Sequence, residues 1–178
     1  MKIGVFCSAN EHIDPDFFSM TEALGQWIGH EGHQLVFGGS NLGLMECVAK
    51  AVHEAGGTTI GMVPSKVEQG GRVSPSLDVN VACDNLSDRK DLMLAQSDIL
   101  VALPGGIGTL DEVFTVAASH SIGYHCKMVI LYDMKDFWAP LIALLDTLQE
   151  RGFVRGHWTD YIRVAHTLDE VKAEVARV

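Results

Sequence analysis

Residues 104–109, Pro-Gly-Gly-Ile-Gly-Thr, have the composition of a turn that binds an anion. The segment follows an apolar run at residues 99–103 and precedes a helical pattern, so it joins a buried strand to a helix. Such a turn leaves backbone N–H groups free at the positive end of the helix, where phosphate binds favourably. We therefore predict a phosphate site here. The alternative is that the glycines only make a tight turn.

Glu112 follows that turn on the same predicted helix, three residues after Thr109. A carboxylate within one sugar's length of a bound phosphate can stabilise an oxocarbenium-like transition state and orient the attacking water. If Thr109 is the N-cap, the same spacing is that of a capping box, which is the structural alternative.

Arg89 and Lys90 lie in the first turns of the helix that precedes the strand at 99–103. Cations are disfavoured near a helix N-terminus, so their presence calls for another reason. The planar fork of Arg89 suits a phosphate or a sugar hydroxyl. The alternative is a solvated surface pair, and for Lys90 alone an ion pair is the simpler interpretation.

A second glycine-rich turn, Gly-Gly-Ser-Asn-Leu-Gly at residues 38–43, follows another strand-like run. Two such turns on one edge of a sheet can face the same anion. Neither matches G-x-x-x-x-G-K-[ST], which disfavours a P-loop nucleotide triphosphatase. The turn after the first strand, residues 7–10, has no glycine, so a dinucleotide of the Rossmann type fits poorly. A mononucleotide fits better.

The elements that position these turns alternate between strands and helices along the chain. This alternation predicts an α/β fold: a Rossmann-like, doubly wound, mainly parallel sheet with helices on both faces, in one nucleotide-binding domain over residues 1–178. The expected strands are 3–7, 34–37, 58–63, 79–82, 99–103, 128–132 and 161–164. The expected helices are 14–30, 43–54, 84–96, 109–122, 137–151 and one opened by Thr167 as a capping box, with a polar loop at 64–77.

Composition excludes several classes of protein. The net charge of -10 disfavours a nucleic-acid partner, which needs a basic surface. No H-x-x-x-H or H-E-x-x-H spacing occurs among the eight histidines, so we predict no metal site. Four scattered cysteines, no signal-peptide pattern and no apolar run long enough for a bilayer predict a soluble cytoplasmic protein with reduced thiols and no membrane contact.

The stretch Asp88-Arg89-Lys90, followed by Pro-Gly-Gly-Ile-Gly-Thr-Leu-Asp-Glu at 104–112, resembles the paired signature of the Lonely-guy family. These proteins are cytokinin riboside 5′-monophosphate phosphoribohydrolases that were long described as lysine decarboxylases. The resemblance extends along the chain, through residues 5–8, the turn at 38–45 and Gly123, His125 and Lys127. It implies a homodimer and no metal or organic cofactor.

The resemblance also implies roles for individual residues. Arg89 and Glu112 are the implied catalytic pair. The implied substrate contacts are Gly39, Ser40, Gly43, Met45, Lys90, Gly105, Gly106, Gly108 and Thr109. Departures from the family pattern at Glu46, Ser119 and Ser121 are expected to touch the pocket, and so the choice of base, more than the catalytic pair.

The expected function is hydrolysis of the N-glycosidic bond of a purine nucleoside 5′-monophosphate, either a cytokinin riboside 5′-monophosphate or AMP. The alternatives are a nucleotide or pterin carrier of the molybdenum-cofactor type that performs no turnover, and an interaction protein without a small ligand. A decarboxylase has no support, because no lysine has the Asp or Arg partner that pyridoxal phosphate requires.

Overall fold

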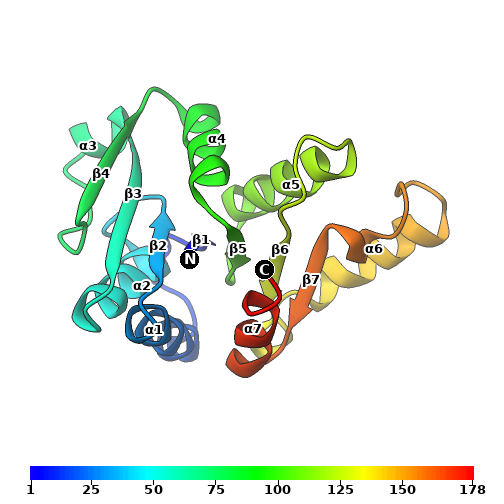
Figure 1. The fold of residues 1–178 in the computed structure, drawn as a ribbon, viewed down its shortest axis with the longest axis horizontal. Coiled ribbons are helices and arrows are strands. Elements are labelled where there is room, and N and C mark those ends of the chain that lie inside the picture. Colours follow the sequence, from blue (N-terminus) through cyan, green and yellow to red (C-terminus); the bar gives the residue numbers. More distant parts are fainter.

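The computed structural model describes residues 1–178 as a seven-stranded parallel sheet with helices on both faces (Figure 1). The strand order is β4-β3-β2-β1-β5-β6-β7, so β1 is central and pairs with both β2 and β5. This confirms the predicted fold class. The strands are β1 (Lys2–Phe6), β2 (Gln34–Phe37), β3 (Thr58–Pro64), β4 (Val79–Cys83), β5 (Ile99–Ala102), β6 (Val129–Tyr132) and β7 (Ile162–Ala165).

The helices lie close to their predicted places. The α-helices are α1 (Pro15–His30), α2 (Gly43–Glu54), α3 (Ser65–Gln69), α4 (Leu86–Gln96), α5 (Ile107–Ser121), α6 (Ala139–Glu150) and α7 (Leu168–Val175). Two 3-10 helices, η1 (Met134–Asp136) and η2 (Trp158–Asp160), complete the chain. None of the helices has the length and apolar composition needed to cross a membrane.

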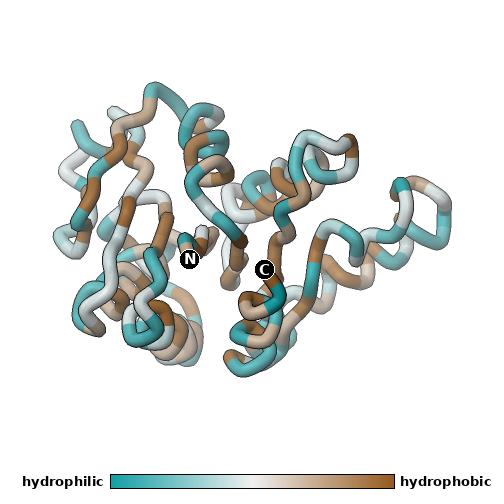
Figure 2. Tube along the Cα trace, in the orientation of Figure 1, coloured by the Kyte–Doolittle hydropathy of each residue, from teal (hydrophilic) through white to brown (hydrophobic).

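Two hydrophobic clusters form the core, one on each face of the sheet. Alternate residues of a strand point to opposite faces, so Val101 belongs to one cluster and Leu100 to the other. Helices α1, α2 and α7 cover the first face, and α4, α5 and α6 cover the second. In Figure 2 the hydrophobic residues accordingly follow the strands and the helix faces turned toward them. The core therefore fixes which loops meet at the carboxyl edge of the sheet.

Several predicted boundaries and one predicted cap are wrong. The polar loop after β3 contains the short helix α3, since Pro64 supplies an extended residue that starts a turn of helix. The helix predicted from 137 starts at Ala139 because η1 precedes it, with Lys135 and Asp136 at positive φ. The final helix has Thr167 as its N-cap, but the reciprocal half of the capping box is displaced: Glu170 accepts the His166 N–H instead.

Candidate active site

The candidate site lies where the order of the sheet reverses. From β1 the chain continues to β2 on one side, while β5 pairs on the other side and leads on to β6. The loop after β1 therefore leads to α1 on one face of the sheet, and the loop after β5 leads to α5 on the other face. The two loops diverge, which leaves a crevice at the carboxyl ends of β1 and β5. A hydrogen bond from the Ser8 N–H to the Pro104 carbonyl, 3.1 Å long, joins the two loops.

The turn after β5 exposes unpaired backbone donors. Gly106 is the N-cap of α5 and provides no side-chain cap. The backbone N–H groups of residues 105–109 have no acceptor within the chain. Gly105 is required for packing, because a Cβ there would lie 2.1 Å from the Thr109 hydroxyl oxygen. The Thr109 side chain is buried behind the turn. The arrangement can hold a compact anion.

Glu112 lies in the second turn of α5 rather than in a cap. The helix begins at Ile107, two residues before the predicted start, so Thr109 is already inside the first turn. The capping-box interpretation of Thr109 and Glu112 is therefore wrong. The Glu112 side chain is buried, with 7 % of the residue exposed, yet it faces a cavity instead of the core.

Arg89 reaches the same place from α4. Asn85 caps this helix through its side chain, and Arg89 follows one turn later. Its Nη2 donates to the Gly38 carbonyl at 2.9 Å and its Nε donates to the Met62 carbonyl at 3.3 Å. Only 12 % of the side chain is exposed, so the interpretation of Arg89 as a solvated surface residue is wrong.

Arg89 and Glu112 form a buried pair of opposite charge, with 4.0 Å between Nη1 and Oε1. Burial raises the pKa of Glu112 to about 7, against the opposing effect of the Arg89 guanidinium, which lowers it. Near neutral pH the carboxyl can thus hold or release a proton. A group of this kind suits a reaction in which charge develops on the substrate.

A cavity of about 240 Å³ contains the pair. It is lined by six of the predicted residues: Met45, Arg89, Gly106, Gly108, Thr109 and Glu112. A neighbouring cavity of about 260 Å³ shares Ser8 and Gly106 with the first and is lined in addition by Gly105, Phe17 and Phe137, among others. A larger cavity, about 560 Å³, lies between α3 and the start of α4 and holds none of the predicted residues.

Four predicted contacts lie outside these cavities. Gly39, Ser40 and Gly43 belong to the turn after β2 and line neither cavity. The Gly39 carbonyl accepts from the Ser74 N–H, and a Cβ at Gly43 would lie 2.6 Å from the Ala9 backbone. Lys90 pairs with the Asp111 carboxylate at 2.7 Å, between α4 and α5. Substrate binding by these four residues stays a prediction.

The loop after β1 was predicted to lie at the carboxyl edge of the sheet, but none of its residues was predicted to belong to the site. Cys7, Ser8 and Ala9 line the first cavity, and burial raises the pKa of the Cys7 thiol well above its usual range, so the thiol stays protonated. The available signal was that this loop follows the strand adjacent to β5. All four cysteines are free, although Cys126 is exposed.

The three departures from the family pattern, Glu46, Ser119 and Ser121, line neither of the two cavities beside the N-terminus of α5. Glu46 accepts a hydrogen bond from the Ser76 hydroxyl at 2.9 Å and so ties α2 to the loop before β4. Ser119 and Ser121 donate to carbonyls of their own helix. The expectation that these residues touch the pocket is therefore not met within the single chain.

Solved structures with the same fold include two proteins described as molybdenum-cofactor binders. The molybdenum cofactor binding protein from Rippkaea orientalis matches with a TM-score of 0.77 and 25 % identity, over 99 % of this chain and 95 % of that one. A Moco carrier protein from Chlamydomonas reinhardtii matches with a TM-score of 0.75 and 27 % identity, over the same shares of the two chains.

Sequence comparison points to one family. A probable cytokinin riboside 5′-monophosphate phosphoribohydrolase from rice is 32 % identical over 96 % of this chain and 70 % of its own length. A cytokinin riboside 5′-monophosphate phosphoribohydrolase from Rhodococcoides fascians is 30 % identical over 86 % of this chain and 78 % of its own length. Residues 45–175 match the family model described as "Possible lysine decarboxylase". The chain therefore belongs to this family, the Lonely-guy family that its motifs predicted.

Proposed function

We propose that this chain hydrolyses the N-glycosidic bond of a purine nucleoside 5′-monophosphate and releases a free base and ribose 5-phosphate. The observation that carries the proposal is the Arg89–Glu112 pair, 4.0 Å apart and buried, in a cavity bordered by the unpaired N–H groups of the α5 N-terminus. The names of the curated relatives support the same activity.

In the proposed complex the phosphate binds the N–H groups of residues 106–109 and the Thr109 hydroxyl. This places the ribose beside Glu112, which lies one turn further along α5 and lines the same cavity. The N-terminus of the helix favours the phosphate charge without a metal ion or an organic cofactor.

The ionised Glu112 stabilises the positive charge that develops on the ribose as its C1′–N bond breaks, and it orients the attacking water. The water oxygen bonds to C1′, the electron pair of the broken bond stays with the base nitrogen, and the proton lost by water balances the charge of the departing base. Arg89 holds Glu112 in place and favours its ionised form, because its guanidinium lowers the pKa of the carboxyl.

The proposal extends to the substrate and to the assembly. N6-modified adenine nucleotides such as a cytokinin riboside 5′-monophosphate, or plain AMP, are the proposed substrates, and the reaction takes place in the cytoplasm. A homodimer is also proposed. Large apolar side chains exposed on α4 and α5 support it, because a second copy would remove them from water: Leu86, Ile107 and Phe114.

A carrier of a nucleotide or a pterin is the second candidate. The fold shared with molybdenum-cofactor carriers over nearly the whole chain favours it. The same cavity would then bind a phosphate-bearing ligand without turnover. The buried carboxylate of Glu112 argues for the hydrolase, since an anion cradle gains nothing from a neighbouring negative charge.

Release of base from AMP and from its N6-isopentenyl analogue tests the two candidates. The hydrolase releases base with the wild type and loses that activity in Glu112→Ala. Asp111→Asn is the matched control, because Asp111 is adjacent in the chain but faces Lys90 at the surface. Equal activity of wild type and Glu112→Ala contradicts the mechanism. Tight binding without product, unchanged in Glu112→Ala, would establish the carrier.

A further inference from the structure

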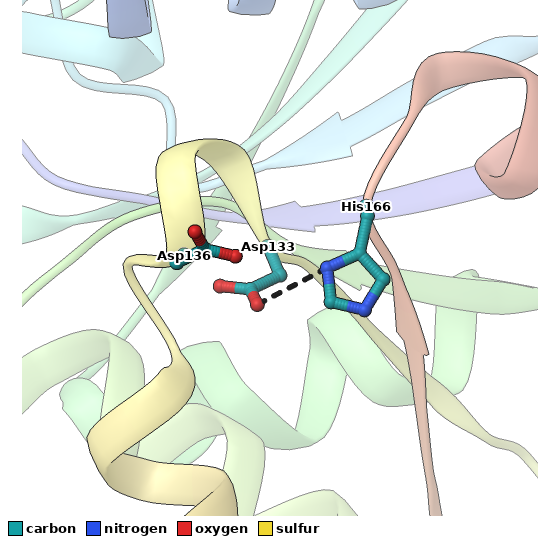
Figure 3. A group of neighbouring side chains, drawn as sticks. All are labelled: Asp133, Asp136 and His166. Atoms are coloured by element: carbon teal, nitrogen blue, oxygen red, sulfur yellow. Dashed lines mark ion pairs between the residues drawn. The ribbon is translucent and has the colours of Figure 1, made fainter.

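Three side chains able to bind a metal ion meet at the carboxyl ends of β6 and β7, outside the candidate active site (Figure 3). Asp133 directly follows β6, Asp136 ends η1, and His166 directly follows β7. One potential ligand atom from each residue lies within 4.8 Å of the other two. The pairing of neighbouring strands thus brings together residues that no local sequence motif connects.

Asp133 supplies a buried carboxylate whose second oxygen has only the exposed His166 ring as a partner. Its side chain is 1 % exposed, and Oδ1 accepts a hydrogen bond from the backbone N–H of Trp138 at 2.6 Å. The second oxygen, Oδ2, points to the His166 ring, with 3.3 Å between Oδ2 and Nδ1 (Figure 3). A buried carboxylate oxygen needs a cation or a donor, and here the exposed His166 ring is the one that it has, so a metal ion can bind between the two.

No lysine or arginine neutralises the two carboxylates of the cluster. Lys135 lies between them in the chain, but its Nζ pairs with Asp14 and Asp16, at 2.6 Å from each. Neither Asp133 nor Asp136 has a lysine or arginine partner. Two carboxylates and an imidazole therefore share one small volume without a permanent positive charge, an arrangement that a divalent cation stabilises.

We propose that Asp133, Asp136 and His166 bind a divalent first-row transition metal ion of the Mn²⁺ or Zn²⁺ kind. Two ligand atoms that each lie about 2.0–2.2 Å from one metal ion are about 3.3–3.6 Å apart in tetrahedral geometry. The separation of Asp133 Oδ2 and His166 Nδ1 matches this. The imidazole ligand favours Zn²⁺ over Mg²⁺ and Ca²⁺, which prefer oxygen alone, and the two carboxylates also suit Mn²⁺. Water completes the coordination.

The site holds η1 against β7. Phe137 directly follows η1 and lines the cavity that also contains Gly105 and Gly106. Its ring contacts Phe17 of α1 edge-to-face, with the ring centres 5.9 Å apart. A bound metal ion thus stiffens one wall of that cavity without contacting Arg89 or Glu112. The proposal is independent of the proposed hydrolysis.

Metal binding by the whole chain tests the site, with Mn²⁺ followed by electron paramagnetic resonance and Zn²⁺ by calorimetry. The wild type is expected to bind one ion, and His166→Gln and Asp136→Asn are each expected to weaken binding by about ten-fold or more. Both substitutions alter exposed residues, so folding is retained and circular dichroism checks it. Asp133 is left intact, because its Oδ1 holds the Trp138 N–H.

His53→Gln is the matched control. His53 pairs with Asp78 through Nδ1, 3.2 Å from Oδ1, in an ion pair of the same kind that lacks a third ligand. The control is expected to bind the metal ion like the wild type. The proposal is overturned if the wild type binds neither Mn²⁺ nor Zn²⁺, or if folded His166→Gln binds them as tightly as the wild type. Asp133 and His166 would then form an ion pair only.

Discussion

The two glycine-rich turns of this protein have similar compositions and different structures. In the turn after β2, the Asn41 N–H donates to the Arg72 carbonyl, the Gly39 carbonyl accepts from the Ser74 N–H, and the Gly38 carbonyl holds Arg89. In the turn after β5, the N–H groups of residues 105–109 have no partner in the chain. Glycine content therefore does not identify an anion site. The turn after β5 is distinguished by free N–H groups that border the cavity containing Arg89 and Glu112.

The largest effect is expected from Gly38→Ala, in the turn that supports the site. A Cβ at this position would lie 1.4 Å from Arg89 Nη2, so the guanidinium must leave its place. We expect base release to fall by about a hundred-fold or more, as when a transition-state group is removed. The free energy of unfolding should fall by about 2–4 kcal/mol, because the donor bonds of a buried cation are lost.

Steady-state kinetics and urea unfolding measure both effects of Gly38→Ala. The control is Gly32→Ala: this glycine lies in a turn far from the site, and a Cβ there meets nothing within 4 Å, although its positive φ carries a small strain. Activity of Gly38→Ala equal to that of the control would show that Arg89 is not held by this turn for catalysis.

Gly105→Ala tests the turn after β5 and should weaken the binding of the substrate phosphate. A Cβ at Gly105 displaces the Thr109 side chain, which lies 2.1 Å away at its hydroxyl oxygen. We expect the KM for AMP to rise by about ten-fold or more, because the phosphate loses a hydroxyl and well-placed N–H donors. The dependence of the rate on AMP concentration measures the KM. An unchanged KM would show that this turn does not bind the phosphate.

The pH dependence of the rate and of stability tests which protonation state of Glu112 acts in catalysis. Catalysis requires its ionised form, so the rate should rise with pH through about 7, the value to which burial raises the pKa. The raised pKa stabilises the protonated folded state, and this stability is lost as pH rises from about 4.5 to 7. Relative to Glu112→Gln, the wild type should thus lose up to about 3 kcal/mol of unfolding free energy over this window.

Rate profiles and urea unfolding at several pH values measure these changes, with Glu112→Gln as the reference that does not titrate at this position. A rate that falls through pH 7 would assign catalysis to the protonated carboxyl. A stability difference that does not change with pH would mean that Glu112 has an ordinary pKa.

The smallest effect is expected at Lys90, which pairs with exposed Asp111 outside the cavity. Such pairs contribute about 1 kcal/mol or less, so Lys90→Gln should change stability and base release little. A loss of more than about ten-fold in kcat/KM would instead support the substrate contact that the family resemblance implies. Lys50→Gln, which removes a surface pair with Glu54, is the matched control.

Periodicity and turn residues were sufficient to predict the seven strands and the fold class, because buried parallel strands are continuous apolar runs such as Ile99–Ala102. The roles of the two glycine turns could not be predicted, since partners such as Arg72 and Ser74 come from a distant loop. The burial of Arg89 depends on the carbonyls of Gly38, in the turn after β2, and of Met62, in β3. Asp133 meets His166 only through the pairing of β6 with β7.

A crystal structure with AMP bound to Glu112→Gln tests the central claim most directly. The claim predicts phosphate oxygens within hydrogen-bonding distance of the N–H groups of residues 106–109, and the ribose C1′ next to residue 112 and Arg89. Phosphate bound at the turn of residues 38–43, or AMP held with its ribose away from residue 112, would contradict it.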